Sequence, residues 1–182
     1  MKNILFVCSI LGLTMTAAFS QSKTAEQIKD TSWITYRVVH PLHEVVAKST
    51  SPEYTVVLDP ATKEIKSVTA KVDVTTFDSG NSNRDSHAME VIDAIDYPEV
   101  DFTSTSVSET GDSLDVTGHL TFHGITKDIT MAGTAQWQPH RVDVHGNFAI
   151  TFTEFKIERP ALLLVPVEDN IAFTLASAFT WK

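Results

Sequence analysis

The chain has 182 residues, a formal net charge of −9 at pH 7 and a single cysteine, Cys8. This length is enough for one domain with a sizeable core, and the acidic balance argues against nucleic acid and anionic membrane surfaces as partners, because both require basic patches. One cysteine also excludes a disulfide within the chain.

The first twenty residues have the composition of a secretory signal peptide. Lys2 gives a positive start, residues 4–18 are mainly apolar, and Ala18 and Ser20 are small residues where a signal peptidase reads them. A membrane anchor is the alternative, but the run is short for a span and no basic cluster follows it. We expect cleavage after Ser20 and a periplasmic or secreted protein. Without Lys2, 13 basic residues remain against 23 acidic ones, a net charge of −10.

Residues 21–31 form a polar stretch, which we expect to be a short disordered or weakly helical lead-in to one domain over residues 32–182. In that domain apolar and polar residues alternate with a period of two, which is typical of half-buried strands. Turn residues such as Asp59-Pro60 and Gln138-Pro139 separate the runs. About eight strands at hairpin spacing predict an all-β sandwich or barrel. The runs lie at residues 34–38, 54–58, 68–74, 100–102, 114–122, 129–135, 142–152 and 171–175.

One segment departs from the alternation and predicts a short helix. Apolar residues in residues 86–95 recur at helical spacing, and Asn81, Ser82 or Asn83 can cap the start of the helix. The helix is expected to end before Pro98, which disfavours helical geometry in the preceding residue. A lone helix between strands of a barrel commonly closes one end of it.

Three short motifs follow one another along the domain. The first has two parts, residues 81–87 (N-S-N-R-D-S-H) and residues 97–102 (Y-P-E-V-D-F). The second is residues 120–127 (L-T-F-H-G-I-T-K), and the third is residues 155–159 (F-K-I-E-R). In order and spacing they resemble the signature of the YceI-like family of polyisoprenoid-binding, lipocalin-like periplasmic proteins. The resemblance covers about residues 32–182, although residues 33–43 depart from the opening pattern of that family.

This resemblance implies an eight-stranded antiparallel, lipocalin-like barrel with a short helix near one end. It also implies an elongated apolar cavity that takes an isoprenoid-like or other lipid molecule, in a carrier or scavenger without a cofactor and without catalytic residues. A small barrel has room either for its own side chains or for one small ligand. The alternative is therefore a packed barrel that serves as an interaction or stress-related structural module without a ligand.

The candidate ligand-binding residues are the larger side chains expected to face inward: Tyr36, Val38, Val72, Val74, Phe77, Phe102, Leu120, Phe122, Phe148 and Phe173. Small inward residues such as Gly118 and Gly146 leave space that larger side chains on other strands either fill or leave open.

Arg84, Asp85 and His87 in the first motif have two interpretations. Arg84 can meet a polar ligand head at the barrel mouth, because a guanidinium group suits phosphate or carbonyl oxygens. Alternatively, Arg84 and Asp85 hold the helix against the barrel by salt bridges and caps. We favour the structural role, which predicts that Arg84→Ala lowers the melting temperature by several degrees.

Two histidine pairs raise the question of a metal. His40 and His43 are three residues apart, on opposite faces of a strand unless Pro41 bends the chain, whereas His119 and His123 are expected on one polar face. Each pair needs further ligands to hold zinc. There is no H-E-x-x-H, C-x-x-C, G-x-S-x-G or glycine-rich phosphate loop. We expect no metal site and no enzyme.

Residues 161–167 (A-L-L-L-V-P-V) form an apolar run before the last strand. We expect it to fill the core or to fold over the barrel mouth as a lid. An exposed run would instead indicate a membrane or partner contact. A transient membrane contact therefore stays open, as does the oligomeric state, for which a homodimer is one alternative.

Overall fold

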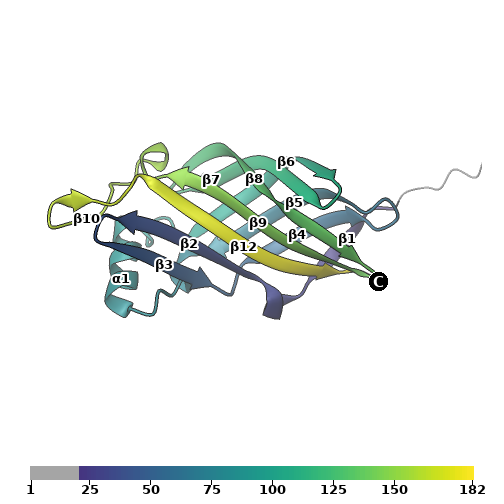
Figure 1. The fold of residues 1–182 in the computed structure, drawn as a ribbon, viewed down its shortest axis with the longest axis horizontal. Helices are drawn as coiled ribbons and strands as arrows, with labels where there is room; N and C mark the ends of the chain where they lie inside the picture. The colour runs from purple at the N-terminus through teal and green to yellow at the C-terminus, as the bar shows by residue number, and fades with distance from the viewer. Residues whose placement is uncertain (1–20) are drawn as a thin grey trace, which may run out of the picture.

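Most of the protein is a ten-stranded antiparallel sheet, and eight of its strands close into a barrel (Figure 1). The structure, a computed structural model, describes residues 21–182, so the predicted signal peptide lies outside it. The ring closes where Glu26 pairs with Thr180. The predicted all-β, eight-stranded antiparallel barrel is thereby confirmed. In ring order the strands are β1 (Lys23–Gln27), β4 (Glu53–Asp59), β5 (Glu64–Asp73), β6 (Glu99–Thr110), β7 (Ser113–Phe122), β8 (Ile125–Gln138), β9 (Arg141–Thr151) and β12 (Asn170–Thr180).

Strand β7 shows why the alternation in the sequence produces this barrel. Leu114, Val116 and Leu120 are almost fully buried, while Asp115 and His119 between them are exposed. Successive side chains of a strand point to opposite faces, so one face meets the interior and the other meets water.

Strand β1 and the short 3₁₀ helix η1 (Lys29–Thr31) occupy the segment expected to be a disordered or weakly helical lead-in. That expectation is wrong for residues 23–27, which pair with β4 on one side and β12 on the other. Ala25 is the one buried residue of this strand, so the sequence carries no alternation there. Pairing on both edges supplies the strand geometry that local propensity does not.

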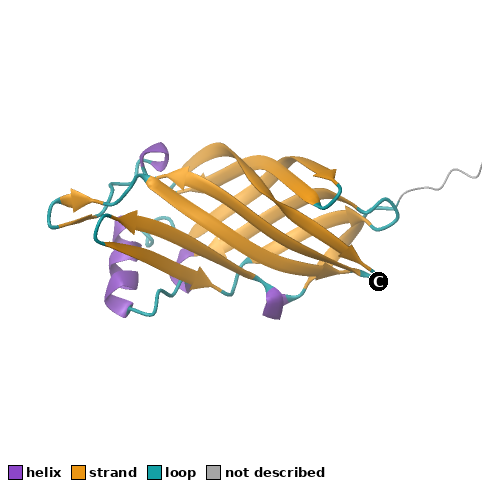
Figure 2. Ribbon diagram, in the orientation of Figure 1, coloured by secondary structure: helices purple, strands orange, loops and turns teal. Residues whose placement is uncertain are grey.

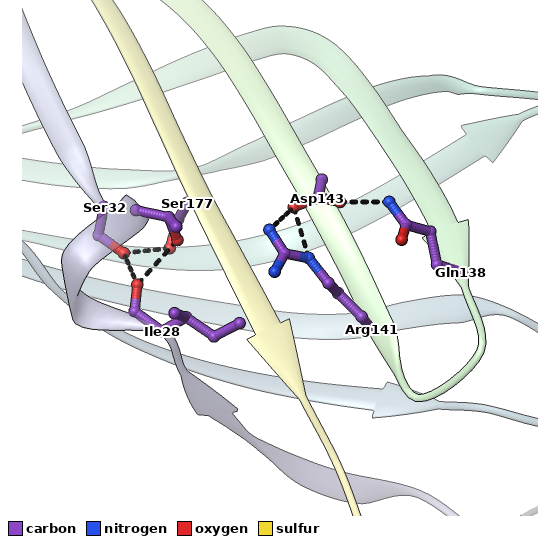
Figure 3. Close-up of polar contacts among 7 residues, drawn as sticks. Ile28, Ser32, Gln138, Arg141, Asp143 and Ser177 are labelled. Atoms are coloured by element: carbon purple, nitrogen blue, oxygen red, sulfur yellow. Dashed lines mark hydrogen bonds and ion pairs between the residues drawn. The ribbon is translucent and has the colours of Figure 1, made fainter.

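A second hairpin, β2 (Trp33–His40) and β3 (His43–Ser49), extends the sheet beyond the ring, because β2 pairs with β12 past the point where β1 ends. The bend between β1 and β2 is held by Ser32, whose Oγ donates to the Ile28 carbonyl oxygen at 3.0 Å and lies 2.8 Å from Ser177 Oγ (Figure 3). Within residues 21–182, the outer edge of β3 pairs only through a bridge from Lys48 to Asp78.

The predicted helix is present as α1 (Ser82–Val91), preceded by η2 (Val74–Thr76). Asn81 is its N-cap, because the Asn81 side-chain oxygen accepts a hydrogen bond from the Arg84 backbone N–H at 3.2 Å. The helix lies across one end of the barrel (Figure 2). None of the helices in residues 21–182 has the length and apolar content needed to cross a bilayer.

The two ends of the barrel are packed differently. Leu58, Leu114 and Val142 are at most 1 % exposed and close the end that contains the C-terminus. At the other end α1 packs on a cluster that includes Phe122, together with Phe155 of η3 (Thr153–Phe155). A small separate hairpin, β10 (Ala161–Leu162) with β11 (Val165–Pro166), projects from this second end (Figure 1).

Candidate functional site

An apolar cavity of about 440 Å³ lies inside the barrel between the two clusters. Small-molecule pockets in proteins typically measure about 300–1,000 Å³, so the space is of ligand size. Phe102, Phe148 and Phe173 line it and are only partly buried, because part of each ring faces the empty space. The barrel is therefore not filled by its own side chains.

All ten candidate ligand-binding residues line this cavity, and their contact with a ligand stays a prediction. They are Tyr36, Val38, Val72, Val74, Phe77, Phe102, Leu120, Phe122, Phe148 and Phe173. Inward-facing Tyr54, Ala70, Ile129 and Met131 also line it. These four residues also lie at inward positions of the alternating runs. The sequence could therefore have identified them, although they were not among the candidates.

Aromatic pairs shape the middle of the cavity. Phe148 of β9 and Phe173 of β12 stack with ring centroids 4.7 Å apart and planes within 6°. Tyr36 of β2 and Phe77 are tilted, with centroids 5.3 Å apart. Such side chains give an apolar, rigid wall that suits a hydrocarbon better than a charged molecule.

Two tyrosines place hydroxyl groups in or beside this apolar space. Burial raises the pKa of Tyr54, whose hydroxyl has no hydrogen-bond partner within residues 21–182. The pKa of Tyr36 is also raised, mainly by burial and further by the negative charge of Asp85, while Arg84 opposes the shift. Both hydroxyls therefore stay neutral at physiological pH, which preserves the uncharged character of the cavity.

The cavity opens at the end covered by α1. Among the residues that line it, those exposed to solvent are His43, His87, Ala161 and Leu162, and all four belong to the β2–β3 hairpin, to α1 or to β10. We call these four residues the mouth. Opposite it the lining includes buried side chains such as Val56 and Leu114, which close that end of the cavity.

The structure separates the three polar residues of the first motif. Arg84 and His87 line the cavity near the mouth, and Asp85 does not. Asp85 accepts hydrogen bonds from the Ser79 backbone N–H at 3.1 and 3.3 Å, which ties the helix to the loop before it. Within the described residues Arg84 forms no ion pair. Of the salt bridges and caps in the structural interpretation, the contact of Asp85 with Ser79 is present, whereas a salt bridge of Arg84 is not, and Arg84 lines the cavity instead.

The structure places the two histidine pairs in different surroundings. Within residues 21–182 no three His, Cys, Asp or Glu side chains are grouped so as to hold a metal ion. His40 and His43 come together across the Pro41 turn, with ring centroids 5.1 Å apart. The expectation that His119 and His123 share one polar face is wrong, because β7 ends at Phe122.

His123 instead adopts a left-handed backbone conformation, with φ of 50°, after the last residue of β7. Its ring Nδ1 lies 3.0 Å from the Phe155 carbonyl oxygen. The ring thus fastens η3 to the β7–β8 turn and has a structural role.

The apolar run at residues 161–167 is divided between two environments. Val167 is buried, as expected for a core residue, but all of residues 161–166 are exposed. The expectation of core filling or a lid is therefore wrong for the tip of the run. A tight turn at Leu163 and Leu164 joins β10 to β11. These two strands pair with each other and with no strand of the barrel.

Comparison with known proteins places this architecture in a family. Residues 26–179 match the model of the YceI-like domain. A UPF0312 protein of Pseudomonas savastanoi is 29% identical over 124 residues, which cover 63% of this chain and 65% of that protein. Protein YceI of Escherichia coli O157:H7 is 32% identical over 99 residues, covering 50% of this chain and 52% of that protein. The matches thus span between half and two thirds of these relatives.

Solved structures share the fold at low sequence identity. BcnA of Burkholderia cenocepacia has a TM-score of 0.72 at 20% identity, covering 81% of this chain and 95% of its own. A polyisoprenoid binding domain from Saccharophagus degradans has a TM-score of 0.67 at 12% identity, covering 87% and 98%. Taken with the family match over residues 26–179, these likenesses show that the chain belongs to the YceI-like domain family.

Proposed function

We propose that the protein binds an isoprenoid-like or other lipid molecule inside the barrel and carries or sequesters it without chemical change. The observation that carries the proposal is the apolar cavity of about 440 Å³ inside the barrel. The polyisoprenoid binding domain from Saccharophagus degradans, which shares the fold, supports the isoprenoid class. The composition of residues 1–20 supports export to the periplasm or out of the cell.

The expected affinity is reasonable in magnitude. Burying about 400 Å² of apolar ligand surface contributes roughly 10 kcal/mol at about 25 cal/mol per Å². Association costs of about 4–15 kcal/mol oppose this gain. Because the cavity is already formed, little of that cost goes into ordering the protein, and micromolar or tighter binding is expected for a chain that fits.

Two polar groups of the lining, Ser177 and His40, support binding without catalysis. Ser177 is engaged by Ser32, and both ring nitrogens of His40 have backbone partners, the Leu42 N–H and the Val165 carbonyl oxygen. Nucleophilic catalysis requires a hydroxyl or thiol activated by an adjacent base. Ser177 and His40 instead make structural hydrogen bonds and are not paired as a nucleophile and its base.

Native mass spectrometry of the protein purified from its own cells tests the proposal. We expect a bound hydrophobic molecule of a few hundred daltons, released by organic extraction and replaced when geranylgeraniol is added. A clean ligand-free mass, together with no uptake of geranylgeraniol, would favour the alternative of a structural module without a ligand.

Replacing Arg84 tests the position of the ligand head. If a phosphate head lies at the mouth, Arg84→Ala should weaken binding of geranylgeranyl diphosphate by about tenfold to a hundredfold, the effect of one charge-assisted hydrogen bond. Binding of geranylgeraniol should hardly change. Isothermal titration calorimetry with both compounds measures this, and the melting temperature should stay within a few degrees, since Arg84 forms no ion pair within residues 21–182. Equal losses for both compounds would contradict a head-group contact.

A further inference from the structure

We propose that the tip of the β10–β11 hairpin inserts into the surface of a lipid bilayer and docks the mouth against it. This interaction surface does not depend on which molecule fills the cavity. It is indicated by the position of the exposed apolar side chains, by the geometry of the hairpin and by its continuity with the cavity lining.

The large hydrophobic side chains exposed in residues 21–182 gather at one end of the molecule. Leu163 is 79% exposed and Leu164 is 98% exposed at the hairpin tip, and Leu42 is 69% exposed in the β2–β3 turn. Ile95, after α1, is 97% exposed. In Figure 1 the hairpin projects along the long axis, away from the C-terminus, and beside the β2–β3 hairpin and α1. The complete set is Leu42, Val46, Ile95, Tyr97, Leu162, Leu163, Leu164 and Val165.

The two leucines at the tip of the hairpin have a backbone conformation that leucine disfavours. Leu163 has φ of 51° and Leu164 has φ of 66°, so both adopt the left-handed conformation of a type I′ turn. That turn favours Asn-Gly, and bulky side chains in it are strained. Leucine is thus disfavoured here both by backbone geometry and by exposure. A departure from local rules without a structural gain is typical of a functional position.

The hairpin is held in place and is continuous with the cavity. His40, itself buried, accepts a hydrogen bond from the Leu42 N–H at Nδ1, which places its ring proton on Nε2, 3.0 Å from the Val165 carbonyl oxygen. Ala161 and Leu162 line the cavity while Leu163 and Leu164 point to solvent. An apolar surface therefore runs from inside the barrel to the outermost residue of the tip.

A bilayer fits this surface better than a protein does. A stable protein interface uses about 20–30 residues on each side, whereas the exposed apolar set has eight members, spread over two hairpins and the segment after α1. A bilayer needs no shape complementarity and accepts apolar side chains to a depth of about 5–10 Å. Residues 160–167 contain no charge, and the whole chain has a net charge of −9. A zwitterionic surface such as phosphatidylcholine is therefore the expected partner.

A reporter variant tests the insertion directly. The emission that Leu164→Trp adds to that of the three native tryptophans should shift to the blue and be quenched on vesicles of brominated phosphatidylcholine. His140→Trp is the matched control, because His140 is also an exposed turn residue with positive φ, 59°, and lies near Trp181 at the closed end. Equal quenching of both reporters, or no quenching of Leu164→Trp, would overturn the proposal.

A second variant separates docking from folding. The double substitution Leu163→Asn with Leu164→Gly should reduce co-flotation with phosphatidylcholine vesicles by about tenfold or more, because two apolar side chains no longer leave water. Its melting temperature should be unchanged or higher, since Asn-Gly suits the turn. If the double variant is less stable than expected, Leu164→Ser supplies the same comparison.

Binding of geranylgeraniol without vesicles should be the same in the wild type and the double variant, so a failure of docking is distinguishable from a failure of lipid binding. Undiminished flotation of the double variant would refute hairpin docking. So would a wild type that ignores vesicles but forms a dimer that the double substitution dissociates, because a second copy of the chain would then be the occupant.

Discussion

Ala70→Trp should abolish binding of geranylgeraniol while leaving the barrel folded. Ala70 lies on β5 between Tyr54 of β4 and Phe102 of β6, and all three line the cavity. An indole at this position occupies the middle of the cavity and separates the closed end from the mouth. Because most of the apolar contact of a long chain is lost, affinity should fall by about a hundredfold or more. Calorimetric titration with geranylgeraniol measures the loss.

Thr69→Trp provides the matched control for this experiment. Thr69 is the neighbour of Ala70 on the same strand and is exposed, so its side chain points outward. The control should bind as the wild type does. A ten-carbon alcohol, short enough for half of the cavity, should still bind Ala70→Trp. If Ala70→Trp bound geranylgeraniol normally, the ligand would have to lie elsewhere than in the barrel.

Phe155→Ala should be among the most destabilising single substitutions in the protein. Phe155 is 0% exposed, and its ring packs against Phe122 with centroids 5.6 Å apart. Truncating a buried phenylalanine to alanine costs about 3–5 kcal/mol, through lost apolar burial and the cavity left behind. Urea unfolding followed by circular dichroism should show this decrease in the free energy of unfolding, and the melting temperature should fall by roughly 10 °C or more.

Glu158→Ala is the control, since Glu158 is exposed in the same segment. Its free energy of unfolding should stay within about 0.5 kcal/mol of the wild type. Phe155 does not line the cavity. Under conditions where Phe155→Ala remains folded, ligand affinity should therefore be nearly unchanged. A loss of affinity without a loss of stability would show that the F-K-I-E-R motif serves binding and not folding.

Strands with a clear alternation of apolar and polar residues were predictable from the sequence. Strands whose geometry depends on pairing with neighbouring strands were not. In β7 the alternation of buried and exposed residues gave both the strand and its inward face. Strand β1 has a single buried residue, Ala25, and owes its geometry to hydrogen bonds with β4 and β12. Strand β3, absent from the prediction, likewise depends on pairing with β2.

The cavity was expected from the family resemblance, but its position is not the one that the inward glycines suggested. Inward glycines were expected to leave space, but neighbours occupy those positions. A Cβ added to Gly118 would lie 2.6 Å from the Phe102 ring, and one added to Gly146 would lie 2.4 Å from Met131 Sδ. The space lies instead between the larger apolar side chains that line the cavity. Such a gap depends on barrel geometry, which periodicity along one chain does not encode.

The hairpin at residues 161–166 shows a related limit of pattern analysis. An apolar run indicates burial only if some partner covers it, and here the run pairs with itself. Sequence alone gives the hydrophobicity of the run but not the tight turn that carries it into solvent.

The closed end has a consequence for the length of the guest. Because Leu58, Leu114 and Val142 seal the base, the barrel is a blind tube that fills from the base outward. A hydrocarbon shorter than the tube leaves inner walls uncovered, and a longer one leaves its surplus in water. In both cases apolar surface is left uncovered, at a cost in binding free energy proportional to its area. The depth of the tube therefore selects one range of chain lengths.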